Sequence, residues 1–102
     1  KRMNFIYEPA LLEYMQKKGK NTIVVEEITS NNSDFEVTEL HVHLIDEKRA
    51  EHFKSQKRYL GVKTEKGEVL LPPFRLKIDD TVTFGLKSFL GIKYVSYKGI
   101  QK

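Results

Sequence analysis

The feature that most constrains the fold of this chain is a series of short β-prone segments separated by turn residues. From residue 22 onward, turn signals recur about every 8 to 12 residues, which is typical of a β-sandwich or barrel. The segment 22–29 is apolar at three consecutive positions, Ile23, Val24 and Val25. We therefore expect this strand to lie inside a sheet.

One stretch ahead of these segments has helical periodicity instead. Pro9 suits the first turn of a helix, and Leu11, Leu12 and Met15 recur at helical spacing. Gly19 supplies a left-handed stop. The pattern predicts one amphipathic N-terminal helix.

These patterns together predict the fold class. We expect an α+β, strand-dominated single domain over residues 1–102, with one N-terminal amphipathic helix packed on a small curved mixed or antiparallel β-sandwich or partly open barrel. A chain of 102 residues can bury a modest core without disulfides or metals. Met3 resembles a native start, so we expect Lys1 and Arg2 to be additions to the natural chain.

Three local features refine this expectation. Asp46 could cap a short helix to about residue 54, but its apolar side consists of Ala50 and Phe53 alone, and the expected fold does not include it. The alternation of apolar residues slips in phase between 37 and 40, which predicts a β-bulge near Thr38 and Glu39. Asp79 and Asp80 predict a turn between two strands rather than a catalytic carboxylate pair.

The chain contains no cysteine, and this excludes several classes of chemistry. Thiolate nucleophiles, disulfide scaffolds, Cys-based zinc sites and Cys-ligated clusters are all ruled out. Ser33 and Ser55 lack a nucleophile elbow, and the glycines never fall into a phosphate-cradling spacing. We therefore expect no enzymatic activity, no catalytic residues and no cofactor.

The net charge of +4 conceals a strong asymmetry along the chain. Residues 1–47 carry 5 basic and 9 acidic side chains (net −4), whereas residues 48–102 carry 13 and 5 (net +8). The candidates for binding an anion or nucleic acid are Lys48, Arg49, Lys54, Lys57 and Arg58. That function requires these cations to share one face, and acidic residues interrupt the segment.

Two histidines share one side of an expected strand. His41 and His43 are two residues apart, Glu39 points the same way, and His52 is a conceivable third ligand. The alternative is that the histidines occupy ordinary solvent-facing positions, because the apolar residues between them claim the core face. A usable metal site needs three or four convergent ligands, and the sequence supplies two.

No segment of the sequence looks suited to crossing a membrane. No apolar run approaches the roughly 18 residues that a membrane-spanning helix needs, and no secretory signal is evident. We therefore expect a cytoplasmic protein with no membrane among its partners.

The order of segments resembles a known family. The matching pieces are Met3–Ile6, Pro9–Met15 followed by Lys18-Gly19, Thr22–Val25 and the closing run Ser88–Ile100. Together they resemble the HesB-like proteins related to A-type iron–sulfur carriers, most closely the small branch named for a Cys-Cys or selenocysteine motif. The match is better at the two ends of the chain than in the middle.

The resemblance implies reactive thiols at places where this chain has none. In that family they lie in the loop after the first long strand, and in the carriers also near the C-terminus. The corresponding positions here are Ser30–Ser33 and Gly99–Lys102. Asn and Ser cannot replace thiolate as a soft ligand for iron, so no cluster-binding residue carries over.

We therefore expect a non-catalytic binding or interaction protein that resembles a cysteine-free HesB-like protein, with a protein partner or a second copy of itself. Such a role predicts an exposed apolar patch, an open sheet edge or a stable dimer. The alternative is anion or nucleic-acid binding through the basic second half, and a weaker alternative is divalent-metal binding through His41 and His43.

Overall fold

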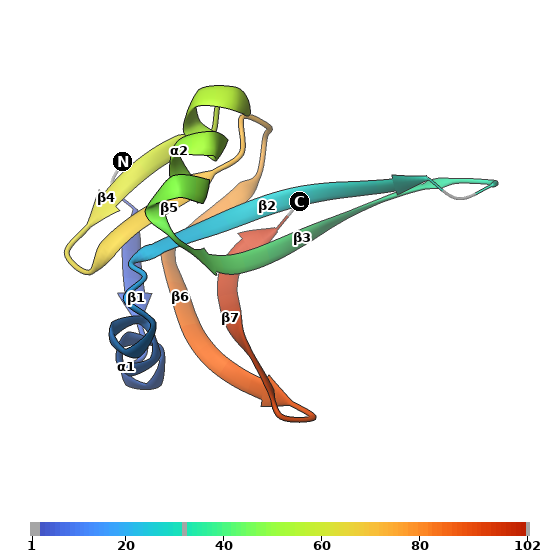
Figure 1. The fold of residues 1–102 in the computed structure, drawn as a ribbon. Helices are drawn as coiled ribbons and strands as arrows, with labels where there is room; N and C mark the ends of the chain where they lie inside the picture. Colours follow the sequence, from blue (N-terminus) through green and yellow to red (C-terminus); the bar gives the residue numbers. More distant parts are fainter. Residues whose placement is uncertain (1–2, 32, 102) are drawn as a thin grey trace.

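The computed structural model describes residues 3–31 and 33–101, so Lys1 and Arg2 lie outside the described residues. Strands predominate, as the sequence predicts (Figure 1). The elements are β1 (Asn4–Tyr7), α1 (Pro9–Lys18), β2 (Thr22–Asn31), β3 (Glu36–Ile45), α2 (Glu47–Gln56), β4 (Leu60–Thr64), β5 (Gly67–Leu71), β6 (Lys77–Phe89) and β7 (Ile92–Gln101).

The described strands form two mixed sheets that do not close into a barrel. One sheet has the order β1-β6-β7, with β1 parallel and β7 antiparallel to β6. The other has the order β3-β2-β5-β4, in which the β2–β5 pair is parallel. The expected α+β, strand-dominated class is confirmed, but the expectation of a single helix is wrong, because α2 is a second one.

Strand β2 is buried on both faces, as its apolar run predicts. Ile23, Val24 and Val25 are all completely inaccessible to solvent. Successive strand residues point to opposite faces, so β2 contributes to two clusters at once. Ile23 and Val25 enter the main core, and Val24 enters a second cluster beneath α2.

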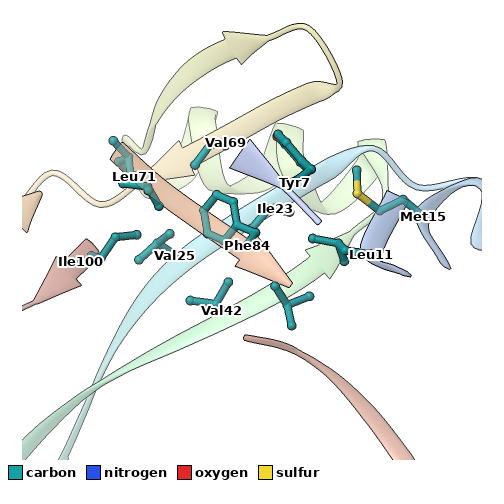
Figure 2. Close-up of a cluster of buried hydrophobic side chains, with 12 residues drawn as sticks. Tyr7, Leu11, Met15, Ile23, Val25, Val42, Val69, Leu71, Phe84 and Ile100 are labelled. Atoms are coloured by element: carbon teal, nitrogen blue, oxygen red, sulfur yellow. The ribbon is translucent and has the colours of Figure 1, made fainter. Parts of the chain in front are cut away.

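The main core lies between the two sheets and α1. Figure 2 shows Phe84 of β6 in the middle of this cluster. Its buried members come from six strands and one helix: Tyr7, Leu11, Met15, Ile23, Val25, Val42, Val69, Leu71, Val82, Phe84, Val95 and Ile100. Residues far apart in sequence therefore fix the two sheets against each other.

Helix α1 begins and ends, and helix α2 begins, at residues with the expected chemistry. Pro9 occupies the start of α1, and Gly19 ends it with a φ of 67°. The side chain of Asp46 caps α2 by accepting a hydrogen bond of 2.9 Å from the Arg49 backbone N–H. Helix α2 then buries Ala50 and Phe53 against the outer face of the four-stranded sheet.

The expected β-bulge near Thr38 and Glu39 is absent from the described residues. The β2–β3 register runs without interruption from Thr22 opposite Ile45 to Asn31 opposite Glu36. The distal half of this hairpin extends beyond the sheets (Figure 1) and is largely exposed. Leu40 packs against the main core, while Val37, an odd number of residues away, lies on the other face of β3, so the two apolar sets do not share a face and need no extra residue.

The expected turn at Asp79 and Asp80 is also wrong, because both residues lie within β6. Here the β6–β7 register shifts between Ile78 and Thr83, so the strand continues through an irregularity instead of reversing. Gly99 accommodates this irregularity with a φ of 95°. A Cβ at Gly99 would lie 2.5 Å from the backbone oxygen of Thr81.

This close approach leads to a prediction about two glycines of the same hairpin. Gly91 also has a positive φ, of 82°, but a Cβ there would meet open space. We expect both Gly91→Ala and Gly99→Ala to lose stability from the left-handed backbone, and Gly99→Ala to lose about 1–3 kcal/mol more from the clash. Chemical denaturation of both variants measures this, and equal losses would contradict the close packing at Gly99.

Candidate binding surface

The β6–β7 hairpin ends in an unusual turn. Phe89 pairs with Ile92, so Leu90 and Gly91 form a two-residue loop. Both have positive φ values, 52° and 82°, the pattern of a type I′ turn. Such turns favour Asn, Asp or Gly at the first position, because other side chains clash with the backbone there. Leu90 is therefore in a conformation that its side chain disfavours.

Leu90 is also the most exposed large apolar side chain among the described residues, at 86%. Phe89, Ile92 and Tyr94 beside it are 68%, 71% and 47% exposed. Residues that pair across the hairpin share a face, and alternate residues along a strand do too, so Phe89, Ile92 and Tyr94 lie on one face. We call Phe89, Leu90, Ile92 and Tyr94 the tip patch. Figure 1 shows the hairpin projecting away from α2 and from the β4–β5 pair.

Lysines lie on both faces of the hairpin beside the tip patch. Lys87 pairs with Tyr94 and so shares the face of Phe89 and Ile92, whereas Lys93 follows Ile92 directly and lies on the opposite face. The last two residues of α1, Lys17 and Lys18, line a cleft of about 490 Å³ together with Lys93 and Gly91. Glu13 is the one acidic residue among those lining this cleft. Residues 81–102 contain no Asp or Glu, so the charged side chains of the hairpin from Thr81 onward are all basic.

The two candidate metal-ligating histidines lie next to each other on β3. The ring centroids of His41 and His43 are 6.0 Å apart. His41 Nε2 lies 3.0 Å from Glu39 Oε1, and His43 Nε2 lies 3.8 Å from Glu26 Oε1. His52 is on α2, where its ring contacts Phe53. Among the described residues, no three His, Asp or Glu side chains converge on a possible metal position.

The candidate cations on and after α2 lie on two sides of that helix. Lys48 and Lys54 line a cleft of about 860 Å³, where Lys54 Nζ is 2.9 Å from Glu68 Oε1. Arg49 and Lys57 instead lie over the ring of Phe53, at 5.7 Å and 5.1 Å from its centroid.

The remaining contacts of these cations are also within the chain. Lys57 Nζ is 4.0 Å from Glu26 Oε2. Arg58 has a φ of 60° just beyond the helix. Glu47 and Glu51 line the same cleft as Lys48. The five cations therefore do not form a single uncompensated basic face.

Comparisons with protein-family models, with curated proteins and with solved structures find no match for this chain. Among the described residues, no helix has the length and apolar character to cross a membrane.

The sequence interpretation missed the tip patch, although the signal was present. Phe89, Leu90 and Gly91 come just before the last strand, within the closing run Ser88–Ile100. Hairpin turns normally contain polar residues or glycine, and this one has three large apolar residues around a single Gly. That departure from turn composition could have marked the patch.

The conformation of Leu90 gives a prediction about stability. Leu90→Asn should raise the free energy of unfolding by about 1 kcal/mol, because Asn tolerates the left-handed region that Leu disfavours. Ile92→Asn, at a similarly exposed neighbour without this backbone conformation, should give no such gain. Thermal or urea denaturation of the two variants tests this; a stability loss in Leu90→Asn would contradict it.

His43 gives a prediction about pH. Partial burial is the main cause that lowers the pKa of His43; His41 and Arg49 lower it further, and Glu26 opposes them. Because the pKa of the folded state lies below the unfolded value of 6.5, the unfolded chain binds the proton more readily. Stability contributed by neutral His43 is thus lost as the pH falls through and below 6.5.

We expect His43→Gln to lose less stability than the natural chain between pH 7.5 and pH 5.5, as measured by denaturation at each pH. An unchanged loss would contradict this assignment.

Proposed function

We propose that this chain is a non-catalytic binding protein and that the tip patch is its contact surface. The observation that carries the proposal is Leu90, an 86% exposed apolar side chain held at a φ of 52°. Strain in a sparsely populated backbone region is a common mark of functional sites. An apolar side chain in such a turn costs stability and gains nothing within the monomer, so a contact outside it accounts for the residue.

The proposed scaffold is a HesB-like one used without cluster chemistry. In support, the chain opens with the strand–helix–strand order β1-α1-β2, and the closing run spans the β6–β7 hairpin. The segment that corresponds to the family's thiol-bearing loop includes Ser30 and Asn31, the last two residues of β2, and Ser33 in the loop that leads to β3. Asn32 of this loop lies outside the described residues. We also propose a cytoplasmic location, for which the lack of cysteine is the support.

The proposal does not depend on the other candidate residues. Several of the cations around α2 are engaged by Glu26, Glu68 and the ring of Phe53. The histidines contact individual carboxylates of their own sheet. Among the described residues, no comparable intramolecular contact covers Phe89, Leu90 or Ile92, which are 68%, 86% and 71% exposed.

The test compares two exposed phenylalanines. Phe35, at the end of the β2–β3 hairpin, is 61% exposed and thus close to Phe89 at 68%. In extracts of the source cells, the tagged natural chain and Phe35→Ser should sediment with a larger assembly or with membranes. Phe89→Ser combined with Leu90→Asn should sediment as the free 11.9 kDa protein.

Sedimentation of the natural chain as a free monomer would overturn the proposal. Equal losses of this co-sedimentation in Phe35→Ser and in the Phe89 and Leu90 variant would also overturn it, because exposed phenylalanines in general would then account for the association. Circular dichroism of each variant shows that folding is retained.

A further inference from the structure

The shape of the tip patch narrows the class of partner. Four side chains at the end of a two-residue turn form a narrow, convex surface. A stable protein–protein interface typically uses about 20–30 residues on each side. A lipid surface has no such requirement, because it deforms around a small apolar projection and buries it in the boundary between headgroups and acyl chains.

The charges around the tip patch point the same way. Lys87 lies on the face of the hairpin that carries Phe89 and Ile92, and Lys93 lies on the opposite face, where it lines a cleft together with Lys17 and Lys18 at the end of α1. Lysines that border an apolar surface can extend their ammonium groups into the headgroup region while their stems stay with the apolar residues. They also attract anionic lipids and disfavour a second copy of this positively charged hairpin.

Tyr94 lies at the base of the patch and Leu90 at its end, which matches the layering of a membrane interface. Aromatic side chains with a polar group favour the headgroup level, and aliphatic ones favour the acyl region below it. Leu90 is the outermost residue of the loop and Tyr94 is two residues beyond Ile92 along β7.

We propose that the tip patch inserts into the surface of a membrane containing anionic lipids, with the four lysines at headgroup level. This inference rests on the proposed function, because it names the partner of the same surface. The sequence-based expectation of no membrane partner came from the lack of a spanning segment, and a surface contact needs none.

The first experiment measures insertion directly. The chain has no tryptophan, so a single Trp reports on one position. Phe89→Trp should show a blue shift of its fluorescence with vesicles of equal parts phosphatidylglycerol and phosphatidylcholine, and none with phosphatidylcholine alone. Phe35→Trp is the matched control, since Phe35 is similarly exposed but lies between Asp34 and Glu36. It should show no shift with either vesicle.

The second experiment separates the apolar contribution from the charge contribution. In co-sedimentation with the same anionic vesicles, the variant with both Phe89→Ser and Leu90→Asn should lose affinity by at least roughly tenfold, because it no longer buries these apolar side chains. Lys87→Gln combined with Lys93→Gln should also lose about tenfold, since each lysine near an anionic surface contributes. Lys63→Gln combined with Lys66→Gln, at the β4–β5 turn, should bind like the natural chain.

The outcomes distinguish this inference from the function on which it rests. Vesicle binding that the Phe89 and Leu90 substitutions leave unchanged, or that gives no blue shift, would overturn insertion in favour of charge adsorption. No vesicle binding at all would also overturn it. If the extracts still showed association dependent on the tip patch, a protein partner would replace the membrane and the proposed function would stand. Concentration-dependent dimerisation abolished by the same substitutions would assign the surface to a second copy.

Discussion

The two-sided burial of β2 is the constraint on which the rest of the fold depends. Ile23 and Val25 face the core shared by the two sheets and α1, while Val24 faces the cluster beneath α2. The same strand pairs with β3 along its whole length and with β5 in parallel. A polar residue at any of these three positions would be buried without a partner on one side or the other, so β2 fixes both layers at once.

Two hairpins grow out of this centre, and they differ in chemistry. The β2–β3 hairpin extends beyond the core with polar and acidic residues around a single exposed Phe35. The β6–β7 hairpin carries no acidic residue from Thr81 onward and ends in the tip patch. The irregularity opposite Gly99 bends this hairpin. Strand β6 can therefore contribute Phe84 to the core and still extend beyond the core. The inferred contact with a membrane surface thus depends on the same strand that fills the core.

Local signals predicted most individual elements correctly. The stop at Gly19 lies where residue chemistry places it, and Asp46 caps the helix that the expected fold left out, because each is decided within a few neighbouring residues. The errors occurred where the outcome depends on distant partners. Asp79 and Asp80 have the composition of a turn, yet β6 continues through them and pairs with β7 again from Thr83 onward. A bulge was expected at Thr38 on the assumption that Val37 and Leu40 share one face, but the uninterrupted register puts them on opposite faces.

The sequence alone determined the strand-rich α+β class, the buried character of β2, and the absence of any thiol, since composition and periodicity are sufficient for these. The tertiary structure alone decided which candidate residues meet. It divided the α2 cations between two sides and engaged several of them with Glu26, Glu68 and Phe53, and it left the histidines without a third ligand among the described residues. It also brought the lysines of α1 to the β6–β7 turn. The physical reason is that solvent exposure and charge pairing depend on which elements pack together, and this is set by contacts between residues far apart in the chain.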